Sequence, residues 1–140
     1  MNDDELRRIL TETKRIALVG ASNKPERPSH HVMEYLLEHG FDVTPVNPCL
    51  AGQEILGRKV VASVAEAAPL DMVELFRRSE DVGPPVDEAI RLGARTIWMQ
   101  LGVINEAAAA KARAAGLAVV MDRCPAIDMP RLGLGSGHRR

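Results

Sequence analysis

With 140 residues and 46% hydrophobic side chains, the chain has the size and composition of one globular domain, not of a disordered chain. A net charge of −1 gives no basis for a nucleic-acid or membrane surface. Two cysteines without a CxxC spacing argue against a disulfide framework or a zinc finger. The sequence shows neither a signal peptide nor an apolar run of membrane-spanning length, so the cytoplasm is the expected compartment.

Helix and strand patterns alternate along the first half of the chain. The predicted elements are, in chain order, a helix at 3–13, a strand at 15–20, a polar loop at 21–28, a helix capped by Ser29 and stopped by Gly40, and a strand at 41–46. Asn47-Pro48 ends that strand, and an irregular segment follows at 49–58.

The second half continues the alternation. Its predicted elements are a short strand at 60–61, a brief helix at 63–68, a strand at 72–76, a helix at 81–92, a strand at 96–100, a helix at 105–115 and a strand at 117–121. The glycine-rich tail, about residues 129–140, is expected to be flexible.

Continuous apolar strands, recurring about every 20 to 25 residues between helices, are typical of a sheet covered on both faces. Such a pattern favours parallel strands joined by right-handed crossovers. The predicted fold class is therefore α/β: a single Rossmann-like three-layer domain over residues 1–140, with a mostly parallel sheet and a core at about 5–128.

In an open parallel sheet, ligands bind at the carboxyl ends of the strands. The first such edge supplies Gly20, Ala21, Ser22, Asn23, Lys24, Pro25 and Arg27. Gly20 permits a close backbone approach, and Lys24 and Arg27 place positive charge near a helix N-terminus, which favours phosphate. The competing interpretation is a surface loop that carries two solvated charges.

Three further edges follow later strands. Asn47, before Pro48, either bonds a ribose or adenine or only turns the chain. Phe76 either lies against an adenine or belongs to the core, and it precedes Arg77 and Arg78. The last edge is Met99, Gln100, Leu101 and Gly102, where Gly102 again permits a close backbone approach.

The dinucleotide fingerprint is absent, because Ser22 and Pro25 stand where its second and third glycines belong. No acidic residue follows the second strand to hold a ribose diol. NAD is accordingly disfavoured.

No catalytic or metal-binding residue is predicted. His30 and His31 open a helix without an HxxxH partner. Cys49 and Cys124 both follow strand ends, but the sequence supplies no triad to lower a thiol pKa, so a packing role is favoured for each.

Taken together, these edges resemble the stand-alone CoA-binding domain proteins, which are similar to the N-terminal domain of the succinyl-CoA synthetase α subunit. The stretches that carry the resemblance run in order over about residues 5–128, and they are Ile16-Ala17-Leu18-Val19-Gly20-Ala21-Ser22 with Arg27-Pro28-Ser29, Pro45-Val46-Asn47-Pro48, Phe76-Arg77-Arg78, Trp98-Met99-Gln100-Leu101-Gly102 and Val119-Val120-Met121-Asp122-Arg123-Cys124-Pro125.

The resemblance implies a CoA-binding fold whose first-loop contacts fall on Ser22, Asn23, Lys24 and Pro25, with a later group near Met99, Gln100 and Leu101. The synthetase's CoA lysine falls near Leu50, which is a departure. Its phosphohistidine domain has no equivalent here, so ligase activity does not carry over.

The expected function is binding of CoA or an acyl-CoA without catalysis. The alternatives are an enzyme that acts on a CoA thioester and an NAD(P)-binding, oxidoreductase-like protein. Neither nucleic acid nor a membrane is expected as a partner, whereas a homodimer or a partner protein stays open.

Overall fold

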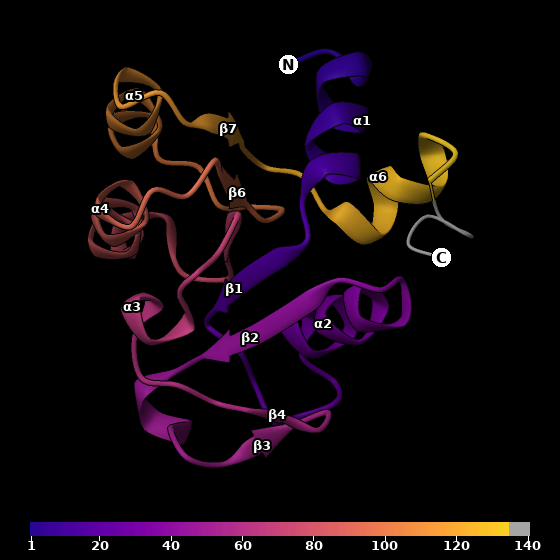
Figure 1. Ribbon diagram of the computed structural model, residues 1–140, viewed down its shortest axis with the longest axis vertical. Helices are drawn as coiled ribbons and strands as arrows, with labels where there is room; N and C mark the ends of the chain where they lie inside the picture. The colour runs from indigo at the N-terminus through magenta and orange to yellow at the C-terminus, as the bar shows by residue number, and fades with distance from the viewer. Residues whose placement is uncertain (135–140) are drawn as a thin grey trace.

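The protein, described here by a computed structural model of residues 1–134, is built around a parallel sheet (Figure 1). The sheet has five strands: β1 (Arg15–Val19), β2 (Asp42–Val46), β5 (Met72–Leu75), β6 (Thr96–Met99) and β7 (Ala118–Val120). Every pairing is parallel, in the order β2-β1-β5-β6-β7. The predicted α/β fold class is confirmed.

Helices cover both faces of this sheet (Figure 1). One face packs against α1 (Asp3–Glu12), α2 (Pro28–Glu38) and α6 (Pro125–Arg131), and the other against α3 (Val64–Ala67), α4 (Gly83–Arg91) and α5 (Glu106–Ala114). Alternate residues of each strand enter the two cores, because successive side chains of a strand point to opposite faces. Trp98 thus belongs to the first core and Met99 to the second, and both are fully buried.

Between β2 and α3 the chain leaves the sheet and forms a small wall beside it. This segment contains the 3₁₀ turn η1 (Pro48–Leu50) and an antiparallel hairpin, β3 (Glu54–Ile55) with β4 (Arg58–Lys59). The short strand predicted at 60–61 does not form. The strands of the hairpin lie at 54–55 and 58–59 instead, and Val61 makes only an isolated bridge to Val46. Ile55 and Val60 are buried in the first core, which anchors the wall.

The tail that is predicted to be flexible from residue 129 begins within a helix in the part that the structure describes. Helix α6 extends to Arg131, with Met129 fully buried and Leu132 nearly so. The carboxylate of the buried Asp128 accepts two hydrogen bonds from the Arg123 guanidinium, at 2.8 and 3.0 Å. Residues 135–140 of the predicted tail lie outside the described residues.

Candidate functional site

The candidate site lies where the strand order reverses. From β1 the chain crosses to β2 on one side, whereas β5, β6 and β7 extend the sheet on the other. Ligands of open α/β sheets bind outside the carboxyl ends of the strands at such a switch point. Here the two ends are Gly20, after β1, and Phe76, after β5.

Gly20 is required for this edge. Its φ is +88°, and a Cβ at this position would overlap the carbonyl oxygen of Phe76. The Phe76 N–H donates to the carbonyl of Val19 at 2.8 Å, so the two strand ends are held together. A side chain at position 20 would therefore separate them.

The N-terminus of α2 opens at the same edge. The sequence predicts Ser29 as the cap of this helix, but the cap is Arg27 and α2 starts at Pro28, two residues earlier than predicted, because a proline suits the first helical position. The preceding residue, Arg27, makes no side-chain capping hydrogen bond. Ser29 is 5% exposed and reaches the site. The positive end of the helix dipole is thus left for an anion.

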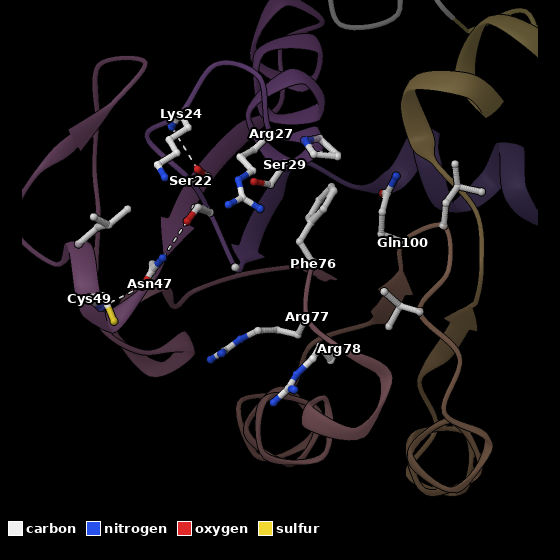
Figure 2. Close-up of a pocket in the computed structure, with 16 residues that line it drawn as sticks. Ser22, Lys24, Arg27, Ser29, Asn47, Cys49, Phe76, Arg77, Arg78 and Gln100 are labelled. Atoms are coloured by element: carbon white, nitrogen blue, oxygen red, sulfur yellow. Dashed lines mark hydrogen bonds between the residues drawn. The ribbon is translucent and has the colours of Figure 1, made fainter.

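A pocket of about 570 Å³, here called the site pocket, lies in front of these ends (Figure 2). Its lining residues are Gly20, Ala21, Ser22, Lys24, Arg27, Pro28, Ser29, Asn47, Cys49, Leu50, Phe76, Arg77, Arg78, Gln100, Leu101 and Val103. Among them are four basic side chains and no acidic one, although the whole chain carries a net charge of −1. Such a lining creates a positive potential that attracts anionic ligands.

Asn47 holds two walls of the site pocket together. Its Nδ2 donates to the Ala21 carbonyl at 2.9 Å, and its Oδ1 accepts from the Cys49 N–H at 2.9 Å (Figure 2). The amide therefore links the loop after β1 to η1. Of the two interpretations of Asn47, the structure favours the one in which it shapes the chain.

Gln100, at the carboxyl end of β6, has a buried polar atom without a partner. The side chain is 6% exposed, and its Oε1 accepts no hydrogen bond from the described residues. It lines the site pocket, as does the half-buried Phe76. A buried acceptor left unbonded destabilises a fold, so a ligand that donates to this oxygen would gain by it.

Glu74 lies directly below the site, in the middle of the sheet between Leu18 and Trp98. It is fully buried, and neither carboxylate oxygen has a hydrogen-bond partner among residues 1–134. Burial raises the pKa of Glu74 to about 8, so the side chain is mostly neutral at physiological pH. The positive potential of the pocket is consequently not offset by a charge from this residue.

The structure brings together ten of the fifteen predicted site residues in the lining of the site pocket: Gly20, Ala21, Ser22, Lys24, Arg27, Asn47, Phe76, Arg77, Gln100 and Leu101. The other five lie outside it. Asn23, Pro25 and Pro48 are exposed, Met99 is buried in the core against α4 and α5, and the Gly102 N–H donates to Asp122 Oδ1 at 2.7 Å.

Six lining residues were not among the predicted site residues. The sequence places Arg78 and Leu50 near predicted sheet edges, whereas Pro28 and Ser29 belong to a stretch that carries the resemblance but are predicted as loop and helix cap. Their signal was the Arg27-Pro28-Ser29 sequence, since a proline at the first helical position leaves the helix end open. Val103 had no local signal, because only the fold brings it to the pocket.

The two cysteines differ in exposure. Cys124 is 6% exposed in the core beside α6, as the packing interpretation predicts. Cys49 is exposed and lines the site pocket, so the packing interpretation is wrong for Cys49.

Residues 1–134 hold no group of three or more His, Cys, Asp or Glu side chains that could bind a metal. Nor does this part of the chain contain a helix of the length and apolar character needed to cross a membrane.

The strand order, the basic pocket at the switch point and the open helix end are typical of α/β proteins that bind nucleotide-like ligands. A family model described as a CoA binding domain matches residues 14–130, and the chain belongs to this family. It is 40% identical over 121 residues to the uncharacterized protein YneT of Bacillus subtilis (strain 168), covering 86% of this chain and 88% of that protein.

Among solved structures, a hypothetical protein from Pyrococcus horikoshii OT3 is similar, with 46% identity, a TM-score of 0.89 and coverage of 94% of this chain and 92% of that one. A dinucleotide-forming acetyl-coenzyme A synthetase from Ca. Korarchaeum cryptofilum is 23% identical, with a TM-score of 0.67. That match covers 81% of this chain but only 27% of the synthetase, and at this identity it shows the fold alone.

Proposed function

We propose that this protein binds CoA or an acyl-CoA in the site pocket, in the cytoplasm and without a reaction of its own. The observation that carries the proposal is the lining of the pocket, which has four basic side chains and no acidic one among its described residues and includes the open end of α2. CoA has a pyrophosphate and a further phosphate, so it is the kind of polyanion that such a lining favours. Membership of the CoA-binding domain family supports this choice.

The apolar part of the lining suits the rest of such a ligand. Leu50, Leu101 and Val103 line the site pocket together with Phe76. Leu50 stands where the synthetase resemblance places a lysine, so contact at that point is with an apolar part of the ligand and not with a phosphate. An adenine face or the pantetheine chain are the apolar parts that CoA offers.

NAD is a poorer fit for the same pocket. The carboxyl end of β2 supplies Asn47 where NAD sites carry an acidic residue, and the Asn47 amide is already bonded to Ala21 and Cys49. The loop after β1 has only Gly20 of the three fingerprint glycines.

An enzyme that acts on a CoA thioester is the alternative function. Cys49 is the thiol nucleophile that the pocket would offer, but the lining residues that the structure describes include no His, Asp or Glu to activate it. This arrangement favours binding without catalysis. A free-thiol assay with acetyl-CoA tests the choice, because turnover that is lost in Cys49→Ser would establish the enzyme instead.

The double variant Lys24→Ala/Arg27→Ala tests where the phosphates lie. Charge-assisted hydrogen bonds from two exposed, screened side chains predict that CoA binding weakens about tenfold to thirtyfold, and that this loss shrinks at high salt. Titration calorimetry at two salt concentrations measures both effects. A matched control is Arg8→Ala, because Arg8 is an exposed cation of α1 outside the site pocket. Unchanged CoA affinity in the double variant would mean that the phosphates of CoA do not contact this loop.

A further inference from the structure

The basic residues of the site pocket come from two different segments. Lys24 and Arg27 lie in the loop that leads into α2, on one side of the sheet edge. Arg77 and Arg78 follow β5 and lead toward α4, which covers the opposite face of the sheet. The positive charge of the pocket therefore has two separate sources, and only the first is associated with the open helix end.

The two neighbouring arginines differ in their availability. The Arg78 Nε donates to Asp81 Oδ2 at 2.9 Å, and this hydrogen bond, together with the charges of Asp81 and Glu80, raises the pKa of the Arg78 guanidinium. Its charge is thus offset locally. Arg77 is exposed and makes no side-chain hydrogen bond or ion pair with any residue in the described part of the chain.

The direction of the side chains separates the pair as well. In Figure 2, the Arg77 side chain extends from beside Phe76 toward the wall formed by Asn47 and Cys49, below Arg27. A cation held at the pocket without a counter-charge is able to form strong bidentate hydrogen bonds with a phosphate. Arg78 already donates its Nε–H to Asp81, so it has fewer donors and less unpaired charge to offer a phosphate than Arg77 has.

We propose that Arg77 binds a second phosphate of the ligand, apart from the pyrophosphate at the α2 end, and thereby distinguishes CoA from dephospho-CoA. This assignment rests on the proposed function. CoA has a ribose 3′-phosphate in addition to its pyrophosphate, and dephospho-CoA differs from it only in lacking that group. The ribose separates the two phosphate groups, as the pocket separates Arg77 from Lys24 and Arg27.

Titration calorimetry with CoA and with dephospho-CoA tests the assignment on the parent protein, Arg77→Ala and the matched control Arg78→Ala. The parent should bind CoA about tenfold more tightly than dephospho-CoA. Arg77→Ala should lose most of this preference by weakening CoA, with dephospho-CoA affinity unchanged within about twofold. Arg78→Ala should keep the preference.

Two results would overturn the assignment while leaving the proposed function standing. In one, Arg77→Ala weakens both ligands equally, which marks a general electrostatic effect. In the other, Arg77→Ala binds CoA as tightly as the parent does, and the 3′-phosphate then lies elsewhere. Failure of the parent protein to bind CoA would instead refute the proposed function, and with it the role of Arg77.

Discussion

The amide of Gln100 illustrates how ligand binding and stability oppose each other at one residue. Its Oε1 is buried and accepts no hydrogen bond within residues 1–134, so Gln100→Met, which keeps the size but removes the acceptor, should raise the free energy of unfolding by about 1 kcal/mol. The same change should weaken CoA binding, because a ligand donor loses its acceptor. Urea denaturation and calorimetric titration measure the two effects. A variant that is less stable, or that binds CoA with undiminished affinity, contradicts this account of Gln100.

Glu74 predicts a pH dependence of stability. Burial raises its pKa from 4.5 to about 8 in the folded protein. The contribution of Glu74 to the free energy of unfolding is therefore fully present below pH 4.5 and is lost as the pH rises through about 8. In this range the unfolded chain releases the proton of Glu74 whereas the folded protein keeps it, so a rising pH favours the unfolded state. Between these values the free energy of unfolding should fall by up to about 1.4 kcal/mol per pH unit from this residue.

Glu74→Gln should abolish this slope, since an amide does not titrate. The measurement is urea denaturation of both proteins from pH 5 to pH 9, read as the difference between the two curves. Other titrating groups contribute equally to both proteins and cancel in the difference. Parallel curves would show that Glu74 does not keep its proton in the folded state.

At the scale of elements, the close approach of β1 and β5 depends on Gly20. Gly20→Ala should cost about 3 kcal/mol or more, since the φ of +88° disfavours a side chain and the Cβ would overlap the Phe76 carbonyl. Gly116 is the matched control, with a φ of +93° and no atom within 4 Å of a Cβ. Gly116→Ala should cost only about 1–2 kcal/mol. Thermal denaturation of both variants measures the two losses of stability. Equal losses would mean that the overlap with the Phe76 carbonyl adds nothing to the cost of Gly20→Ala.

The sheet was predictable from sequence because several of its strands contain apolar runs, such as 16–19 and 97–99, that are buried on both faces. Helix α6 was not, because Pro125, Pro130 and the glycines after it indicate coil locally. Its contacts are distant in sequence: Met129 is buried in the core that it shares with α1 and α2, and Arg131 forms an ion pair with Asp3 at 3.1 Å. Contacts of this kind exist only after the chain has folded.

The candidate site, too, was predictable from the sequence only in part. Residues that follow strands, such as Gly20 and Phe76, could be placed from the predicted topology, since parallel strands end at one edge. The direction in which each of these side chains points could not be predicted from the sequence. Met99 and Gln100 are adjacent, yet Met99 points into the core under α4 and α5, whereas Gln100 lines the pocket.

At the scale of the whole molecule, the chain has nearly balanced charge but places four basic residues and no acidic one in the described lining of one pocket, at the switch point of its sheet. Such focusing raises the local concentration of an anionic ligand and makes its binding depend on salt. The proposed binding of CoA accounts for this arrangement together with the open end of α2 and the family to which the chain belongs.

Calorimetric titration of the purified protein with CoA, and in parallel with NAD, tests this claim most directly. The account predicts saturable binding of one CoA per chain, weaker at high salt, with no comparable binding of NAD at the same concentrations. No detectable binding at millimolar CoA, or tighter binding of NAD than of CoA, would contradict it.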